Sequence, residues 1–307
     1  MCEENLFYIK DTEANQRLDI FLTLKFKEKN ISRSQIKNLI EKNNVLVNGK
    51  KIKAGYVIKK NDEIKIKFEA EKNLDVKPEK IDLDIVYEDN EIIIINKPQN
   101  MVVHPGAGNF SGTLVNGLIY HFKNNLSDIN GMLRPGIVHR IDKNTSGILV
   151  VAKNNYAHNF LAEQFAEHKI TREYVAIVKG NFYFDGTINK PIGRDLRDRK
   201  KMAINLNGRR AVTHYYLIKN FRDYSLIKLK LETGRTHQIR VHMASINHSV
   251  LGDEIYGEKD KKFGLIGQAL HAKKLGFIHP KTKRYVEFNH APPKYFLDLI
   301  KKLNARV

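Results

Sequence analysis

The run Gly136-Ile137-Val138-His139-Arg140-Ile141-Asp142-Lys143-Asn144-Thr145-Ser146-Gly147 places one carboxylate, Asp142, among basic residues. The chain has 53 Lys and Arg against 34 Asp and Glu, a formal net charge of +19. Surfaces that meet phosphate exclude carboxylates unless a carboxylate is needed for chemistry. Asp followed by Asn-Thr-Ser-Gly also makes a good turn, in which the carboxylate accepts backbone N–H groups. The rest of the chain decides between a turn residue and a reactive one.

The composition indicates a large domain, alone or with a small one, and a polyanionic partner. A chain of 307 residues that is 42% hydrophobic can bury a sizeable core. The excess of basic residues predicts nucleic acid as the first partner and an anionic membrane surface as the second. The longest apolar stretches, residues 92–95 and 148–152, are far too short to span a bilayer. An acidic N-terminus and a single cysteine, Cys2, predict a cytoplasmic protein without internal disulfides.

Residues 14–70 are predicted to form a small, basic α+β module. Two helical periodicities follow one another, and a Ser-Arg-Ser sequence suits the N-cap of the second helix. A Val-Asn-Gly segment then predicts a hairpin with a type I′ turn, and a last strand alternates apolar residues with lysines. The residues that carry these patterns are Arg17, Leu18, Ile20, Phe21 and Leu24, then Ser32, Arg33, Ser34, Ile36, Leu39 and Ile40, then Val47, Asn48 and Gly49, and finally Ile64, Lys65, Ile66, Lys67 and Phe68.

This module resembles an S4 RNA-binding domain in its Arg-Leu-Asp start, its Ser-Arg-Ser cap and its Val-Asn-Gly hairpin. It departs from that family at Asn43 or Asn44 and at Asn61, where glycine is more common. Asn tolerates a left-handed backbone better than other non-glycine residues, so we expect the turns to persist. The resemblance implies RNA binding, with Arg33 and Lys37 as candidate contact residues.

Residues 71–80 are polar, charged and interrupted by Pro78, which is typical of a linker. Residues 81–307 then form the larger domain. Its short strand-like runs outnumber its helical patterns, which favours an α+β domain on a mixed, mainly antiparallel sheet. The predicted strands are residues 92–95, 137–141, 148–152, 174–178, 212–217 and 226–231, and the predicted helices are residues 157–168, 236–246 and 294–303.

The larger domain contains a series of short sequence blocks, among them His139-Arg140-Ile141-Asp142, Arg172-Glu173-Tyr174 and Thr233-Gly234-Arg235-Thr236-His237. In their order and spacing these blocks resemble the RluA-type pseudouridine synthases, and within them those that act on large-subunit ribosomal RNA. Any one block is weak evidence, but their order and spacing make a chance match implausible. The resemblance implies the pseudouridine synthase catalytic fold. The main blocks are Ile95-Asn96-Lys97-Pro98, Val102-Val103-His104-Pro105-Gly106, His139-Arg140-Ile141-Asp142, Thr145-Ser146-Gly147, Arg172-Glu173-Tyr174, Thr233-Gly234-Arg235-Thr236-His237-Gln238-Ile239-Arg240, Gly252-Asp253 and Leu270-His271-Ala272.

The implied reaction breaks the N1–C1′ bond of a uridine, rotates the base and rejoins it through C5. It needs no redox equivalent, nucleotide or metal, which agrees with the lack of a Walker loop and of a zinc-ligand spacing in the sequence. No cofactor is therefore expected. The reaction does need an ionised carboxylate, which either attacks covalently or takes a proton from the sugar. By the resemblance, Asp142 is that catalytic carboxylate.

The resemblance assigns two further residues to the catalytic group. Arg235 matches an arginine that pairs with the aspartate, since a carboxylate in a closed pocket needs a cationic partner to stay ionised. Tyr174 matches the tyrosine expected to stack on the uracil and to help remove the C5 proton. Taken alone, Arg235 is an ordinary surface or helix-start arginine, and Tyr174 is a half-buried strand residue.

Arg140 matches an arginine that fills the space left by the flipped base, because an enzyme that acts on a stacked base must extrude it. If this run is extended, residues 140 and 142 share a face. His139 is a further candidate for substrate binding. Segment 194–210 carries seven Lys and Arg against two Asp, which predicts an arm that contacts phosphates, with a solvated surface loop as the alternative. Its candidate contact residues are Arg199, Lys200 and Lys201.

Other suggestive residues have simpler explanations. His237 and His242 are five residues apart, which does not match the usual spacing of zinc ligands, so no metal site is expected. Gly106-Ala107-Gly108 lacks the Gly-Lys-Ser/Thr of a phosphate-binding P-loop, and Lys97-Pro98 is interpreted as a structural turn. The remaining histidines of interest are more simply polar core or loop residues: His104, His139, His271 and His279.

The expected partner is a stem-loop of large-subunit ribosomal RNA. The protein is expected to be a monomer, and no membrane partner is expected. Another ribosomal RNA site or transfer RNA stays open, because RNA specificity depends on loop shape and splayed bases. Two other classes remain as alternatives. One is a non-catalytic RNA-binding or ribosome-assembly protein. The other is a hydrolase or nuclease, which would need a metal–carboxylate cluster or an acid–base histidine pair.

Overall fold

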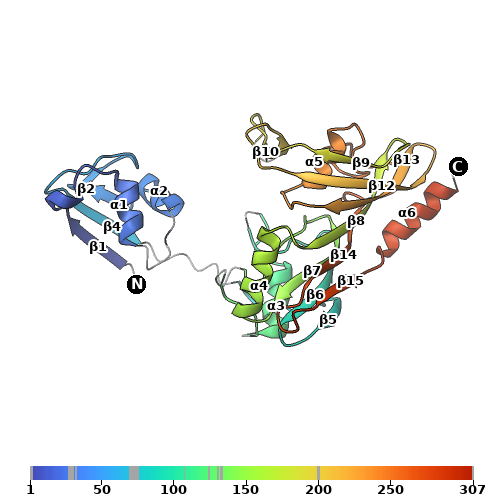
Figure 1. Cartoon of the computed structure of the whole chain (residues 1–307), viewed down its shortest axis with the longest axis horizontal. Helices are drawn as coiled ribbons and strands as arrows, with labels where there is room; N and C mark the ends of the chain where they lie inside the picture. The colour runs from blue at the N-terminus through green and yellow to red at the C-terminus, as the bar shows by residue number, and fades with distance from the viewer. Residues whose placement is uncertain are drawn as a thin grey trace. The chain divides into compact units, whose positions relative to one another are not determined.

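The computed structural model describes residues 3–26, 31, 33–68, 76–106, 108–123, 125–129, 131, 134–198 and 201–305. The chain forms two compact units, Met1–Leu74 and Asp75–Val307 (Figure 1). Each unit has its own sheet and its own hydrophobic core. The α+β class predicted for both parts of the chain is confirmed.

The N-terminal unit packs two helices on a four-stranded antiparallel sheet with the strand order β1-β4-β2-β3. Its apolar side chains come from the predicted periodic positions, among them Leu18 and Ile36 on the helices and Ile64 and Ile66 on the last strand. The elements are β1 (Glu3–Tyr8), a 3-10 turn η1 (Asp11–Glu13), α1 (Leu18–Lys25), α2 (Arg33–Glu41), β2 (Val45–Val47), β3 (Lys50–Lys51) and β4 (Glu63–Phe68).

Left-handed asparagines make the turns of this unit. Asn48 and Gly49 have φ of 51° and 72°, as a type I′ hairpin requires, which confirms the predicted turn between β2 and β3. Asn43 and Asn61 also have positive φ, 62° and 67°, at the positions where glycine was expected. Ser32, the predicted N-cap of α2, lies outside the described residues. The unit also extends further toward the N-terminus than residue 14, because β1 pairs with β4.

The C-terminal unit, Asp75–Val307, is built on a nine-stranded sheet with the order β5-β6-β7-β14-β8-β13-β12-β9, in which β15 also pairs with β14. Among the described strands only β7 and β14 pair in parallel, so the sheet is mixed and mainly antiparallel, as predicted. The elements are β5 (Ile85–Glu88), β6 (Ile92–Lys97), α3 (Leu114–Phe122), β7 (Ser146–Ala152), α4 (Asn155–Ala166), β8 (Thr171–Lys179), β9 (Gly186–Asn189), β10 (Ile192–Arg194), β11 (Met202–Ile204), β12 (Val212–Asn220), β13 (Tyr224–Leu231), α5 (Gln238–Ala244), β14 (Leu270–Ile278), β15 (Tyr285–Asn289) and α6 (Lys294–Asn304).

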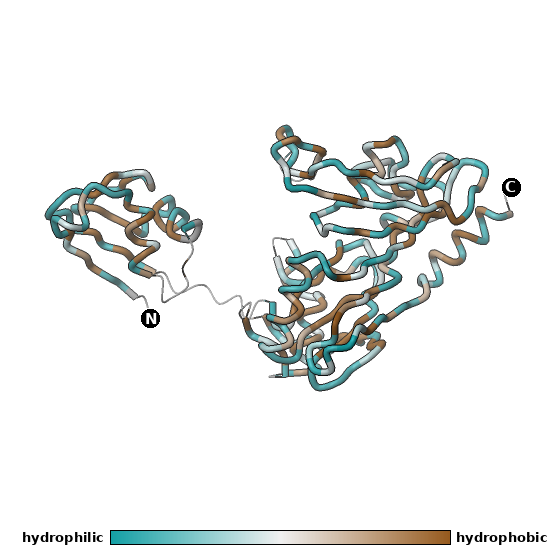
Figure 2. Tube along the Cα trace, in the orientation of Figure 1, coloured by the Kyte–Doolittle hydropathy of each residue, from teal (hydrophilic) through white to brown (hydrophobic). Residues whose placement is uncertain are grey.

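Strands β6 and β7 are buried on both faces, which explains their uninterrupted apolar sequences. Ile93 and Leu149 pack with α3 on one face, whereas Ile92 and Val150 pack with α4 on the other. Burial of each such side chain stabilises the fold by about 1.5–3 kcal/mol. Figure 2 shows hydrophobic residues concentrated along the strands of this unit. The loop that enters β7 is therefore attached to a rigid, fully buried strand.

Strands β8 and β13 are covered on both faces by other helices. Ala176 and Leu229 pack with α5, whereas Val175 and Ile177 pack with α6 on the opposite face. The N-terminus of α5 and the tyrosine side of β8 consequently meet on one face of the sheet. This face carries the site described below.

One predicted strand and the end of the predicted linker differ from the structure. Residues 137–141 do not form a strand: only Ile137 bridges to β7, and the run continues as an irregular segment. The ladder is interrupted here because the side chain of His139, in place of a backbone carbonyl, accepts the N–H of Val150. The end of the predicted linker packs on the C-terminal unit, since Asn116 of α3 hydrogen-bonds with the backbone of Lys77 and Glu79.

Candidate active site

A cavity of about 480 Å³ lies between the loop that enters β7, strand β8 and the N-terminal end of α5. Its volume is in the range of sites that bind small ligands. Three of the predicted catalytic or base-flipping side chains line it together with Asp142, although they are distant in sequence. The lining residues used below are Arg140, Asp142, Arg172, Tyr174, Arg235, His237 and Arg240.

The carboxylate of Asp142 does not cap the turn that follows it. That turn is closed by the backbone, with the Thr145 N–H donating to the Asp142 carbonyl at 3.1 Å. The side chain is thereby left free to face the cavity, where it is 20% exposed. Oδ2 accepts a hydrogen bond from the guanidinium of Arg240 at 3.0 Å. Among the described residues no hydrogen bond reaches Oδ1, so this oxygen is available to a ligand.

Arg240 is held between two carboxylates. Its Nε and second terminal nitrogen donate to the two oxygens of Asp253 at 2.7 and 2.9 Å, and its remaining terminal nitrogen donates to Asp142. Burial lowers the pKa of Arg240, but the hydrogen bonds and charges of Asp253 and Asp142 outweigh burial and raise it. Asp253 is fully buried, and its pKa is lowered because the Arg240 hydrogen bonds outweigh desolvation. Arg240 therefore stays cationic beside Asp142.

The prediction that Arg235 pairs with Asp142 is wrong in this structure. Arg235 lines the same cavity, but its Nε donates to the backbone carbonyl of Arg210 at 2.9 Å. The two arginines lie five residues apart, one before α5 and one within it. Of these two arginines, only Arg240, within the helix, faces Asp142. The direction of the helix could not be predicted from the sequence block.

Tyr174 lies on β8 and forms part of the cavity wall, half-buried beside Arg172. Burial raises the pKa of the Tyr174 hydroxyl, Arg172 opposes this increase and Asp142 adds to it. The phenol is therefore neutral at physiological pH. A neutral aromatic ring in this wall provides an apolar surface against which a planar base can stack.

Arg140 lies at the exposed edge of the cavity, two residues before Asp142. One of its terminal nitrogens donates to Nε2 of His104 at 3.2 Å. Burial and the charges of Arg140 and Arg134 lower the pKa of His104 to about 4, so its neutral ring can accept this bond. His139 lies deeper, where its ring stacks on Phe165 with 4.5 Å between centroids and accepts the Val150 N–H.

Lys97 hydrogen-bonds with the loop that carries Asp142. It is fully buried, and its ammonium donates to the backbone carbonyls of Pro98, Met101 and Lys143 at 2.7, 2.8 and 3.1 Å. Burial lowers the pKa of Lys97 to about 7, against the opposing charge of Asp142. Lys97 is thus more than a turn residue, because it ties the loop of Asp142 to the end of β6.

Residues 91–245 match the model of the family described as RNA pseudouridylate synthase, and residues 16–64 match the S4 domain. The first match covers about half of the chain and contains every lining residue named above. The chain belongs to the RNA pseudouridylate synthase family.

Relatives within this family cover both units. The chain is 42% identical to Ribosomal large subunit pseudouridine synthase D of Escherichia coli (strain K12), over 97% of this chain and 93% of the relative. It is 52% identical to the protein of the same name from Zymomonas mobilis, over 74% of each. The structure of human RNA Pseudouridylate Synthase Domain Containing 1 is 26% identical, with a TM-score of 0.58, and the match covers 73% of this chain and 95% of that one.

Two lining residues of this pseudouridylate synthase were missed by the sequence analysis. Arg240 and His237 both lie within the Thr-Gly-Arg-Thr-His-Gln-Ile-Arg block, but only Arg235 was assigned a catalytic role there, and His237 was considered only as a metal ligand. Nε2 of His237 lies 3.9 Å from Oδ1 of Asp142. The signal for both residues was a helix start with polar side chains on the inward face of its first turn. His242, by contrast, is buried and bonded to Thr213 and to the Lys190 carbonyl.

The basic segment predicted to contact phosphates forms a hairpin of β10 and β11. Lys201, at its base, closes the loop through backbone hydrogen bonds with Asp195 and Asp198. Arg199 and Lys200 lie outside the described residues. At the end of the segment, Arg210 pairs with Glu232 at 2.8 Å.

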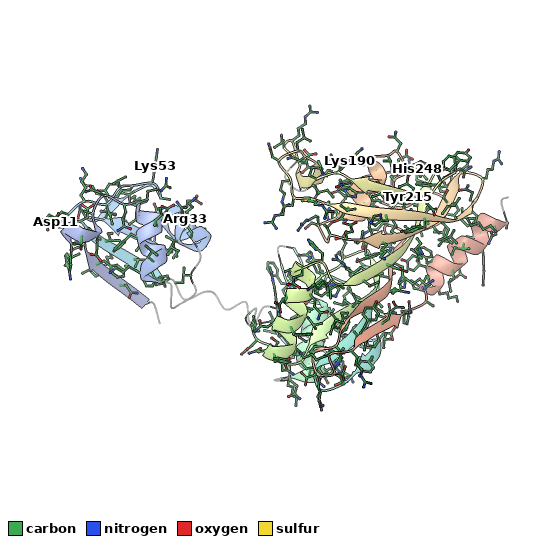
Figure 3. All side chains as sticks on the ribbon, viewed as in Figure 1. Asp11, Arg33, Lys53, Lys190, Tyr215 and His248 are labelled. Atoms are coloured by element: carbon green, nitrogen blue, oxygen red, sulfur yellow. The ribbon has the colours of Figure 1, made fainter. Side chains whose placement is uncertain are left out.

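In the S4 unit, three basic side chains surround one carboxylate. Asp19 of α1 accepts hydrogen bonds from Arg17 at 3.0 and 3.2 Å and from Arg33 of α2 at 2.9 and 3.0 Å. The ammonium of Lys37 lies 4.0 Å away. Arg33 and Lys37, predicted separately as RNA contacts, thus belong to one cluster; Arg33 is labelled in Figure 3.

In the described part of the chain, no three His, Cys, Asp or Glu side chains are grouped so that they could hold a metal ion. None of its helices combines the length and apolar character needed to cross a membrane.

Proposed function

We propose that this enzyme isomerises uridines of large-subunit ribosomal RNA to pseudouridine. The observation that carries the proposal is the asymmetric carboxylate of Asp142, whose Oδ2 is held by Arg240 while Oδ1 faces a cavity lined by Tyr174. An ionised, oriented carboxylate with one oxygen available is what the cleavage of N1–C1′ requires. The names of the relatives from Escherichia coli and Zymomonas mobilis support ribosomal RNA as the substrate.

Asp142 acts on the ribose, by covalent attack or by removal of a sugar proton, and Arg240 holds its Oδ2 in place. Tyr174 stacks on the uracil while the base is detached and turns. The base then rejoins C1′ through C5, which displaces Asp142 from the ribose or is followed by return of the sugar proton. C5 loses its proton, and N1, now free of the sugar, takes up a proton. No external reactant enters this sequence, because the bond that breaks and the bond that forms belong to one nucleotide.

The target base must leave its stack to reach Asp142, and Arg140 is placed to fill the vacancy. It lies at the exposed edge of the cavity and is steadied by His104, so its guanidinium is oriented without being buried. His139 keeps the intervening loop attached to β7. The arginine that fills the vacancy, Arg140, and the carboxylate of Asp142 therefore lie on one short segment.

RNA outside the target nucleotide is bound through phosphates. In the S4 unit, Arg33 and Lys37 present half-exposed cations. The sequence supplies Arg199, Lys200 and Lys201 as further candidate phosphate contacts. A stem-loop is the preferred substrate, because its unpaired bases can be splayed out. A single cysteine in a ribosomal RNA enzyme supports a cytoplasmic location.

The test is conversion of ribosomal RNA taken from cells that lack the gene, followed by mapping of pseudouridines. Wild-type enzyme should restore specific pseudouridines, and Asp142→Asn should lower the rate by at least about 10³-fold. Asp82→Asn is the matched control, because Asp82 is an exposed carboxylate outside the cavity. Equal conversion by Asp142→Asn would refute the mechanism, and cleavage of the RNA that depends on a divalent ion would indicate a nuclease instead.

A further inference from the structure

His237 has a backbone conformation that does not suit a side chain. It is the N-cap of α5, with φ 57° and ψ 19°, in the left-handed region that glycine adopts most readily. Its own side chain does not cap the helix. Strained residues of this kind are concentrated at functional sites, where the side chain is needed. The imidazole of His237 lines the catalytic cavity.

A chain of hydrogen bonds determines which nitrogen of this ring carries the proton. The Met202 N–H donates to the hydroxyl oxygen of Tyr256 at 2.9 Å. The Tyr256 hydroxyl oxygen lies 2.7 Å from Nδ1 of His237. Among the described residues, this nitrogen is the acceptor for the proton of the Tyr256 hydroxyl. Nδ1 is therefore an acceptor, and the neutral ring carries its proton on Nε2.

Nε2 of His237 faces the reactive side of the carboxylate. It lies 3.9 Å from Oδ1 of Asp142, too far for a hydrogen bond but close enough for both atoms to contact one bound group. Burial lowers the pKa of His237, although Asp142 opposes this effect, so the ring is neutral at physiological pH. The site thus presents a neutral N–H donor beside the available oxygen of Asp142.

We propose that the Nε2–H of His237 donates a hydrogen bond to a carbonyl oxygen of the target uracil, and that Tyr256 is the positioning residue that selects this tautomer. This role rests on the proposed function. When N1–C1′ breaks, the electron pair stays on the base, and the uracil anion shares its charge with its carbonyl oxygens. A preorganised N–H donor stabilises such a charge without transferring its proton.

Tyr256 itself is held by the same group that holds Arg240. Its backbone N–H donates to Asp253 at 3.2 Å, and its ring lies 5.1 Å from the guanidinium carbon of Arg240. Asp253 therefore orients both partners of the Asp142 carboxylate: Arg240 directly, and His237 through Tyr256. The cation that holds Asp142 and the donor that meets the leaving base are therefore both oriented by Asp253.

The test is the rate of C5 hydrogen release from large-subunit ribosomal RNA transcripts labelled at uridine C5, with enzyme saturating and in a single turnover. His237→Gly should lower this rate by about 10²-fold. The Kd for the transcript should not rise, and the thermal midpoint of unfolding should not fall. His237→Gln, which restores an N–H near Nε2, should recover most of the rate. Tyr256→Phe should lower it by about 5-fold, since two tautomers then compete for the ring.

Asn247→Gly is the matched control, because Asn247 is also left-handed, with φ 65°, but is exposed outside the cavity. In ring-labelled protein, ¹⁵N shifts of His237 should report protonated Nε2 in the wild type and a mixture in Tyr256→Phe. Wild-type rates in His237→Gly would overturn the proposal. A loss that Gln does not recover, or that matches a loss of RNA binding, would assign the ring a packing role and overturn it too. Absence of conversion by the wild type would instead refute the proposed function.

Discussion

The S4 unit and the catalytic unit each join arginine to aspartate, with opposite burial. In the S4 unit the carboxylate of Asp19 is fully buried, whereas the side chains of Arg17 and Arg33 are 46% and 48% exposed. In the catalytic unit Arg240 is only 6% exposed and Asp142 is 20% exposed. One cluster presents cations to solvent, and the other presents an anion to a cavity.

Under the proposed function, burial therefore selects which partner of the ion pair meets the RNA. Asp19 orders two flexible guanidinium groups that remain available to phosphates, which suits binding without chemistry. Arg240 is itself ordered by buried Asp253, and it donates a hydrogen bond to Asp142 at the cavity. The same residue types thus serve positioning in one unit and catalysis in the other.

The largest effect is expected from Arg240→Met, because it leaves Asp253 buried without its partner. Breaking a buried ion pair in this way lowers the free energy of unfolding by about 3–5 kcal/mol. The rate of conversion should also fall by at least about 10²-fold, since Asp142 loses its cation. Urea unfolding and single-turnover rates measure the two effects.

Arg235→Met is the matched control, since Arg235 lines the same cavity but donates to a backbone carbonyl. It should lower the free energy of unfolding by only about 1 kcal/mol. A loss of rate equal to that of Arg240→Met would restore Arg235 as the essential partner of Asp142.

Asp19→Asn should weaken RNA binding although it removes a negative charge. Two arginines lose their common acceptor, and ordering each of them on binding then adds about 0.5–1 kcal/mol. The Kd for the transcript should rise by about 5-fold, with an unchanged rate at saturating enzyme. Asp11→Asn removes an exposed carboxylate of the same unit as a control. Tighter binding by Asp19→Asn would show that net charge, and not the order of the cations, governs this surface.

Arg33→Met should remove one phosphate contact and leave Asp19 paired with Arg17. The slope of log K against log salt should then fall by about 1, and affinity should fall by about 3-fold. Lys53→Met is the comparison, because Lys53 is an exposed lysine of the same unit outside the cluster (Figure 3). An equal change in slope for the two variants would mean that the S4 unit binds RNA through its general charge.

Acid should destabilise the arginine–aspartate clusters of both units. We expect its effect on the S4 unit to be the smallest of the effects predicted here. Arg17, followed by Arg33, lowers the pKa of Asp19. Its stabilising contribution is therefore present above the unfolded pKa and is lost as pH falls through the lowered folded pKa. Urea midpoints between about pH 5 and about pH 3 should fall less for Asp19→Asn than for the wild type. An equal fall would show that other groups dominate acid unfolding.

Much of the fold was predictable because local signals and burial agreed. The Asn48-Gly49 turn, the helical periodicity of α1 and the apolar sequences of β6 and β7 each indicated their element. Residues 137–141 were predicted as a strand from their apolar alternation. A side-chain acceptor on His139 replaces the ladder there, and such a substitution leaves no periodic signal.

The sequence by itself determined the two units, the family and the segment that carries Asp142, because these depend on residue order and on patterns that local physics imposes. Only the tertiary structure decided that Arg240, and not Arg235, meets Asp142, that His237 faces its other oxygen, and that Asp19 collects Arg17 and Arg33. Those pairings join residues up to about a hundred positions apart. The direction of a side chain on a helix, and its burial, are set only when the sheet and helices pack.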